Sequence, residues 1–286
     1  MKGITIPITA IGPGSQPTEE DGATLDCMSM PNEMNTFEIA NLPEPEDVEN
    51  LVDGLAALRK VRDKLQNYKV DNKTSIIDIS NLNERNRIWI DQVLGHGEVS
   101  VVFQGGVRTD IQESVFAGVW RIQYVDANGS VIRDFVEISA IPDVVKNTTF
   151  IKANEMLELD AEDLPVGVMN AATLVTEMND TITTWKQGDE PHVINLSLLP
   201  HTPEDLVFLE DILGKGPVVI LSRGYGNCRI TSTATKNVWW VQYYNSQDAL
   251  ILNTIEVSSV PGVACASQED FEDSANRFVE IMEIYE

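Results

Sequence analysis

Apolar side chains recur every three or four residues in two separate stretches, which is the spacing of an amphipathic helix. The first stretch covers 48–65 and follows Pro45, a residue favoured in a first helical turn. The second stretch covers 168–185. A short apolar run typical of a strand follows each one, at 75–79 and at 193–197. The pattern predicts two similar parts, each beginning with a helix and a strand.

A second, shorter helix is predicted next in each part. In the later part its start is marked by Thr202 as the N-cap and Pro203 in the first turn. Gly95 and Gly214 stand where a glycine commonly ends a helix. Gly97 and Gly216 follow two residues later, and we interpret both pairs as structural. A phosphate-binding loop would precede a helix rather than follow one.

Three strands are predicted after the short helix of the first part, at about 98–103, 111–125 and 131–138. Adding 119 to these positions gives their counterparts in the second part. The spacing holds without a gap for about 50 residues, which is the signature of an internal repeat. Matching positions include Trp120 and Trp239, and Pro142 and Pro261. The sequence therefore predicts a tandem duplication of an α-β-α-β-β-β unit.

The fold class predicted is α+β, with mostly antiparallel sheets and flanking helices. Ser267 and Asp270 form a capping box at the start of a C-terminal helix. Residues 1–45 are rich in Pro, Gly and acidic residues and are interpreted as an N-terminal arm. The expected domains are this arm, a first repeat unit at 46–150 and a second at 151–286. Whether the two sheets merge is left open.

The acidic composition of the chain disfavours some classes of binding partner. Lys and Arg number 20 against 45 Asp and Glu, for a net charge of −25. This charge disfavours nucleic acid and anionic lipid, because both need a basic face. No apolar run is long enough for membrane insertion, and the N-terminus is a poor secretory signal. The expected location is the cytoplasm.

Candidate chemistry is sparse. The three cysteines, Cys27, Cys228 and Cys265, lie far apart, and no CxxC or HExxH motif is present. We therefore expect no metal, no cofactor and no catalytic residues. Cys265 is the cysteine of most interest, since it follows a Pro-Gly turn and precedes the last helix.

A candidate binding surface comes from comparing the two parts. Trp120 and Trp239 belong to matching apolar strand faces, which is typical of a core. On the opposite face the first part offers Arg121 and the second Trp240. Either a helix covers that apolar face of the second part, with the last helix as the candidate, or the face binds a partner. The candidates for partner binding are Trp240, Tyr244, Leu250, Leu252 and Cys265.

Four segments resemble the HupH/HyaF family of hydrogenase expression proteins. They are GPGSQP at 12–17, LGHGEVS at 94–100, VWRIQY at 119–124, and PGVACASQEDFEDSANRF at 261–278. The last is the most specific, and the resemblance runs over nearly the whole chain.

The resemblance implies a maturation role for an uptake [NiFe]-hydrogenase, exerted on the iron–sulfur small-subunit precursor before export, with a thioredoxin-like accessory protein as a further partner. It transfers no catalytic residue. The leading hypothesis is a non-enzymatic chaperone. One alternative is an iron–sulfur or redox helper using Cys228 or Cys265, and another is a carboxylate-dependent enzyme.

Overall fold

The computed structural model describes residues 42–70, 73–160, 162, 164–224 and 226–286. Nearly all of the predicted N-terminal arm, 1–41, lies outside this range, as does Cys27. Everything that is described belongs to one compact unit. Within the described ranges, no helix has the length and apolar character needed to cross a membrane.

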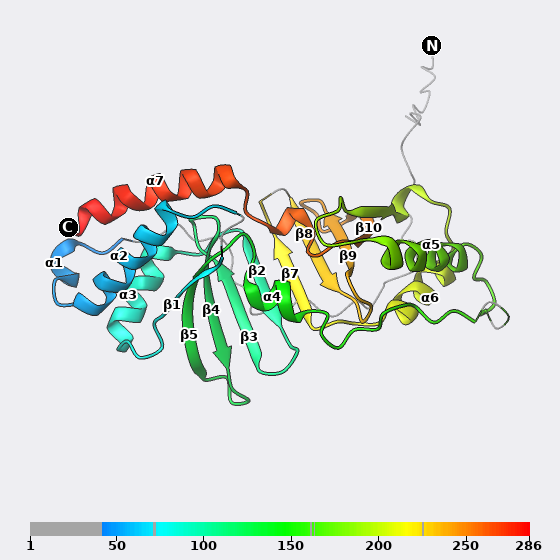
Figure 1. Ribbon diagram of the computed structural model, residues 1–286, viewed down its shortest axis with the longest axis horizontal. Coiled ribbons are helices and arrows are strands. Elements are labelled where there is room, and N and C mark those ends of the chain that lie inside the picture. Colours follow the sequence, from blue (N-terminus) through cyan, green and yellow to red (C-terminus); the bar gives the residue numbers. More distant parts are fainter. Residues whose placement is uncertain (1–41, 71–72, 161, 163, 225) are drawn as a thin grey trace, which may run out of the picture. The chain divides into compact units, whose positions relative to one another are not determined.

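The elements alternate much as the hydrophobic pattern predicts (Figure 1). The helices are α1 Pro45–Val48, α2 Val52–Gln66, α3 Glu84–Leu94, α4 Asp143–Thr148, α5 Ala171–Thr184, α6 Pro203–Leu213 and α7 Gln268–Ile284, with 3-10 turns η1 Leu196–Leu198 and η2 Gly262–Ala264. The strands are β1 Ser75–Asp78, β2 Val99–Phe103, β3 Arg108–Glu113, β4 Val119–Val125, β5 Val131–Ile138, β6 His192–Asn195, β7 Val218–Ser222, β8 Asn227–Ser232, β9 Val238–Tyr244 and β10 Leu250–Val257.

One prediction about the strands was wrong. The span 111–125 holds parts of two strands, β3 and β4, rather than one. The chain turns between them at Gly118, which has φ +82 and whose missing Cβ leaves room for the Phe271 ring. The same division occurs in the second part, between β8 and β9. Each part therefore contributes five strands.

All ten strands form a single antiparallel sheet, in the order β1-β5-β4-β3-β2-β7-β8-β9-β10-β6. The two parts join where β2 pairs with β7, and Val101 lies opposite Ile220 in that register. These two residues are also equivalent at the 119-residue spacing, so a local two-fold axis passes between them. The predicted α+β class is confirmed. The tandem duplication stays our interpretation of the correspondence.

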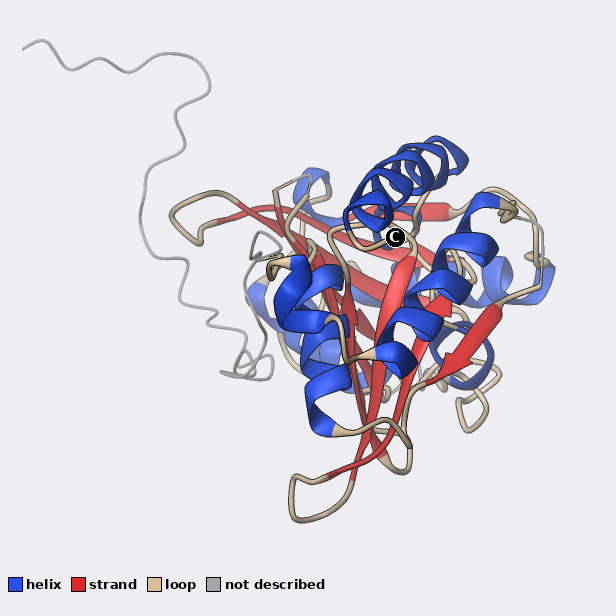
Figure 2. Cartoon of the chain, turned by 90° about the vertical axis from the view of Figure 1, so that its left-hand side faces the viewer, coloured by secondary structure: helices blue, strands red, loops and turns tan. Residues whose placement is uncertain are grey.

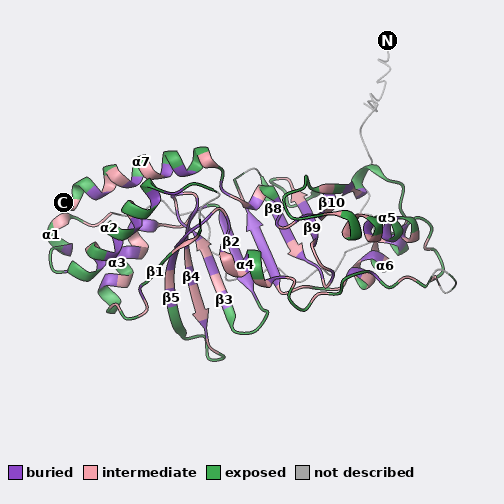
Figure 3. Cartoon of the chain, viewed as in Figure 1, coloured by how far each residue is buried: buried purple, intermediate pink, exposed green. Residues whose placement is uncertain are grey.

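Three core clusters divide the two faces of the sheet. Figure 2 shows helices packed beside the strands, and Figure 3 colours the buried positions. On one face, the centre of the sheet packs against α4 and η2, with Trp120 and Trp239 fully buried there. On the opposite face, α2, α3 and α7 cover the first part, and α5 and α6 cover the second. The face of β9 that carries Trp240 is therefore covered by α5 and α6 and not by the last helix, which packs on the other half of the sheet.

Two segments cross between the halves. After α4, the chain passes onto the second half, where Phe150 contacts Trp239 edge to face and Leu157 enters the core beside α5. After η2, the chain returns to the first half, where the Ala266 N–H donates to the Ala140 carbonyl. The helix α7 then packs along α2, with Phe278 against Phe116. The limits 46–150 and 151–286 remain a prediction. Phe150 precedes the limit and packs on the second half, whereas α7 follows the limit and packs on the first half.

The predicted helix ends are in place. Thr202 and Ser267 cap α6 and α7 through complete capping boxes. Gly95 and Gly214 end α3 and α6 with φ of 57° and 61°. Gly97 allows a close approach, because a Cβ there would lie 2.2 Å from the Ser114 carbonyl oxygen.

Asp205 joins two helix starts in the second half. One carboxylate oxygen accepts from the N–H groups of Met169, Asn170 and Ala171 at the start of α5, and the other accepts from Thr202 N–H. Burial opposes ionisation of Asp205, but these main-chain donors outweigh it and lower its pKa to about 2. The charged form is therefore the one that holds α5 against α6.

We expect Phe278→Ala to lower the free energy of unfolding by about 3–5 kcal/mol, because it empties a fully buried aromatic position between α7 and Phe116. The control is Glu280→Ala, at an exposed position of the same helix, which should change stability by less than about 0.5 kcal/mol. Chemical denaturation measures both. Equal effects would contradict the docking of α7 as a core element.

Asp205→Asn should lower the free energy of unfolding at neutral pH by about 1–3 kcal/mol, because one main-chain donor then loses its acceptor. The folded pKa of Asp205 lies below the ordinary aspartate value of 3.8, so the charged form adds stability above about pH 4, and this stability is lost as the pH falls toward 2. The difference between the two proteins should shrink over that window. The exposed Asp211→Asn on the same helix is the control for denaturation curves measured across it.

Candidate functional site

An apolar hollow of about 400 Å³ opens on the face of the sheet that α4 covers at its centre. Its lining residues come from β1, β4, β5 and the β2–β3 turn, and they are Ile76, Val107, Ile122, Tyr124, Ile132, Arg133, Phe135 and Glu137. Ile76 is 58% exposed and Ile132 is 53% exposed. Exposed β-branched side chains on an edge strand and its neighbour form a surface that another apolar segment could cover.

The strand geometry explains why these side chains gather. Ile76 lies opposite Glu137 on the edge strand β1, and Ile122 lies opposite Phe135 one strand further in. Arg133 lies opposite Tyr124 in the same regular register, and a bulge then follows between Tyr124 and Val125, where Ile132 is the extra residue. The Tyr124 and Phe135 rings meet edge to face at 5.9 Å. The helices α2, α3 and α7 pack on the opposite face.

The predicted partner-binding residues of the second half lie on different surfaces. Trp240 is 7% exposed, belongs to the core cluster built with α5 and α6, and donates its indole N–H to Asn253 Oδ1 at 2.5 Å. Leu250, 45% exposed, and the half-buried Tyr244 pair with each other near the strand ends. A bulge between Leu250 and Leu252 turns Leu252 to the other face, opposite Tyr243. A role of these residues in partner binding stays a prediction, and Trp240 is accessible only if α5 and α6 move away.

The two described cysteines are separate and shielded. Burial raises the pKa of the Cys228 thiol to about 12, against a hydrogen bond with Tyr243 that lowers it. Burial likewise raises the pKa of Cys265 to about 11, and its Sγ lies 3.7 Å from the Pro261 carbonyl oxygen. Thiolates, not thiols, are nucleophiles and metal ligands. Neither position is poised for redox or cluster chemistry in this conformation.

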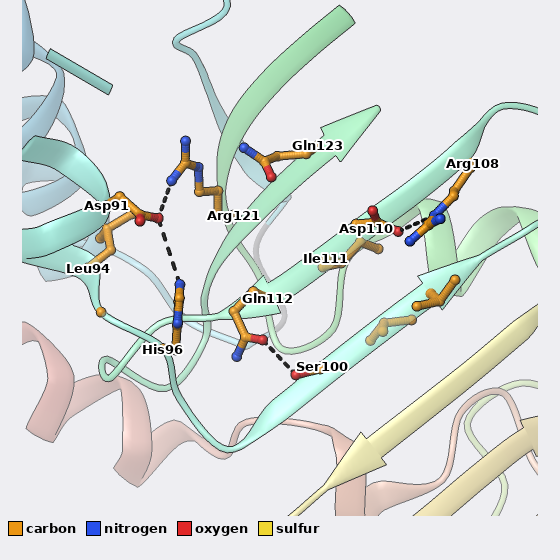
Figure 4. A pocket seen from close by; sticks show the side chains of 13 residues that line it. Asp91, Leu94, His96, Ser100, Arg108, Asp110, Ile111, Gln112, Arg121 and Gln123 are labelled. Atoms are coloured by element: carbon orange, nitrogen blue, oxygen red, sulfur yellow. Dashed lines mark hydrogen bonds and ion pairs between the residues drawn. The ribbon is translucent and has the colours of Figure 1, made fainter. Parts of the chain in front are cut away.

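A polar hollow of about 190 Å³ lies on the opposite face of the first half, beside the end of α3 (Figure 4). Its charged and polar lining residues are Asp91, His96, Ser100, Arg108, Asp110, Gln112, Arg121 and Gln123. At its inner end Arg121 forms a two-pronged ion pair with the buried Asp134, with N–O distances of 3.2 and 2.8 Å. Arg121 also bonds Asp91 at the end of α3. Comparison of the two repeats singled out Arg121 but not the hollow around it.

One buried carboxyl group stands apart from these surfaces. Burial raises the pKa of Glu113 to about 7, the N–H groups of Gly118 and Val99 oppose the rise, and the charges of Glu98 and Asp270 add to it. Its counterpart at the 119-residue spacing is Ser232, whose hydroxyl accepts from Val218 N–H. Both side chains thus receive the N–H of the first residue of a central strand. Glu113 is explained as a structural acceptor.

Among the described residues, no group of three or more His, Cys, Asp or Glu side chains is placed to hold a metal ion. The catalytic, metal and cofactor predictions stay predictions, because the arm is not described.

Comparison with known proteins gives one consistent result. The family described as HupH hydrogenase expression protein, C-terminal conserved region, matches this chain twice, over residues 51–153 and 168–285. Hydrogenase expression/formation protein HoxQ of Cupriavidus necator is 43% identical over 99% of this chain and 98% of its own length. Hydrogenase expression/formation protein HupQ of Azotobacter chroococcum is 44% identical over 96% of each. A solved structure, hydrogenase expression protein HupH from Thiobacillus denitrificans, covers 40% of this chain and 95% of its own, with 31% identity and a TM-score of 0.37.

The chain therefore belongs to the HupH family of hydrogenase expression proteins, and the resemblance seen in its motifs is confirmed.

Glu113→Gln should change the pH dependence of stability. The folded pKa of about 7 lies above the ordinary glutamate value of 4.5, so the free energy of unfolding falls as the pH rises between these values, by up to roughly 3 kcal/mol. The amide removes this fall, so the difference in unfolding free energy between parent and variant should move in the variant's favour as the pH rises from 5 to 8. Urea denaturation at pH 5 and pH 8 measures the effect. Glu269→Gln, at an exposed position, should keep the parent's pH dependence.

Proposed function

We propose that this protein is a non-enzymatic accessory factor of hydrogenase maturation. In this proposal it acts in the cytoplasm as a chaperone for the iron–sulfur small subunit of an uptake [NiFe]-hydrogenase, before export. The family membership supports the link to hydrogenases, because relatives 43–44% identical over nearly the full length are named hydrogenase expression/formation proteins. A thioredoxin-like accessory protein is a further partner in the same proposal.

The observation that carries the chaperone proposal is the apolar hollow. Exposed apolar side chains on a sheet face are typical of surfaces that bind other proteins. The hollow reaches the edge strand β1, which pairs only with β5 among the described strands. An extended segment of a client could therefore lay apolar side chains into the hollow and add main-chain hydrogen bonds along β1.

The net charge of the chain supports the same chaperone proposal. A net charge of −25 attracts a basic client segment and speeds encounter at low salt. It also opposes association between two copies of the chain, so the apolar hollow can stay open in solution. The shielded thiols give the redox-helper alternative no support.

The test is capture of the client by the full-length protein, tagged at its N-terminus, from cells that express the hydrogenase operon. We expect the parent protein to retain the small-subunit precursor with its signal peptide. Ile132→Asp should reduce recovery about tenfold or more, because a charge in the hollow opposes apolar contact. Mass spectrometry and quantitative blotting measure it.

The matched control is Ile251→Asp. Ile251 is the equivalent of Ile132 at the 119-residue spacing and is 61% exposed, but it lies in the second half. The amount of small-subunit precursor that Ile251→Asp captures should equal the amount captured by the parent protein. Equal recovery by all three proteins would argue against the apolar hollow as the client site, and capture of no hydrogenase component would argue against the chaperone role.

A further inference from the structure

The polar hollow, drawn in Figure 4, is small. Sites for small molecules and cofactors commonly measure about 300–1,000 Å³, and this hollow measures about 190 Å³. Its floor is rigid: Ser100 donates to Gln112 Oε1, and the Gln112 amide donates to the carbonyl oxygens of Gly97, Val99 and Glu113. A preformed recess of this size suits one inserted side chain of a partner protein.

The other half of the sheet shows the same place filled. At the 119-residue spacing Arg121 corresponds to Trp240, and Asp134 corresponds to Asn253. Trp240 donates to Asn253 just as Arg121 donates to Asp134 across the equivalent pair of strands. The indole belongs to the buried core there. The hollow is thus a consequence of particular side chains in the first half and not of the fold.

The charges around the hollow favour a cation. Asp134 and Asp91 both bind the one guanidinium of Arg121, and two carboxylates on one cation leave a negative charge. Asp134 is buried, so the accessible share of that charge lies on Asp91, which is 41% exposed. Arg108 and Asp110 form their own ion pair at 2.9 Å. Three carboxylates thus stand against two guanidinium groups.

The neutral groups fit a planar donor. The Gln123 amide nitrogen faces Asp134 Oδ2, because a carboxylate can only accept, and this leaves the Gln123 carbonyl oxygen as an acceptor. Leu94, Val102 and Ile111 supply apolar wall for an aliphatic stem. A guanidinium is weakly hydrated, planar and rich in donors, which suits a half-buried recess better than an ammonium does.

We propose that the polar hollow binds one arginine side chain presented by a partner protein, with the guanidinium beside Asp91. This goes beyond the proposed function, which rests on the apolar hollow of the opposite face. The two are tested separately, because failure to capture a hydrogenase precursor would not alter the binding of a small arginine probe.

The experiment titrates the full-length protein with N-acetyl-arginine methylamide and follows the imidazole NMR signals at fixed pH. His96 is a built-in reporter, because its Nε2 lies 3.9 Å from Asp91 Oδ1. The chain has three histidines, so His96→Gln assigns the signal. We expect a saturable shift of the His96 signal with a dissociation constant of about 1 mM, as suits a single side chain. The His192 and His201 signals should not move.

Two further probes, one uncharged and one negatively charged, and two variants serve as controls. N-acetyl-citrulline methylamide has nearly the same shape without the charge, and N-acetyl-glutamate methylamide carries the opposite charge. Both should bind at least tenfold more weakly. Arg121→Trp combined with Asp134→Asn copies the second half and should fill the hollow and abolish the shift, with thermal unfolding reporting on the fold. Asp91→Asn keeps the shape of the hollow and removes one charge, so it should weaken binding of the arginine probe about tenfold. It also provides the test if the double variant fails to fold.

Equal shifts with the citrulline probe, tighter binding of the glutamate probe, or unchanged arginine binding by Asp91→Asn would each overturn the proposal.

Discussion

The pairing of β2 with β7 is the interaction on which the rest of the structure depends. All ten residues of these two strands are buried, and the register places equivalent residues opposite each other at the local two-fold axis. Without this pairing, each half would expose a row of unpaired main-chain groups at the edge of an apolar strand. With it, the only edge strands of the described sheet are β1 and β6, and each has four residues.

The crossing segments add a second connection between the two halves that β2 and β7 join. Phe150 belongs to the first half in sequence but packs against Trp239 of the second half, and Phe271 and Phe278 show the reverse relation. Each half therefore completes its core with residues from the other. A boundary near residue 150 stays a prediction from the repeat, and segments on each side of it pack on the other half.

Local features were predictable from the sequence because they depend on neighbouring residues. The capping boxes at Thr202 and Ser267 and the helix-ending glycines are of this kind. The merging of the sheets depends on contacts distant in sequence. The mostly apolar runs VSVVF and VVILS still carry a signal, since strict alternation disappears where both faces are buried. The bulge beside Leu252 left no such trace, and it moved that residue off the face on which strict alternation placed it.

Among the differences between the two halves is one pair of positions, and the energetic cost of the pair in the first half bears on function. Arg121 and Asp134 form an ion pair with the carboxylate buried, and removing two charges from water costs several kcal/mol that their attraction only partly offsets. Trp240 and Asn253 occupy the equivalent positions and keep the hydrogen bond without that cost. The fold thus accepts an uncharged, filled arrangement at this place. The first half instead keeps a charged recess at this place, lined by Asp91 and lying beside α3. This difference between the halves supports the proposal that the recess serves recognition, because the fold by itself does not call for it.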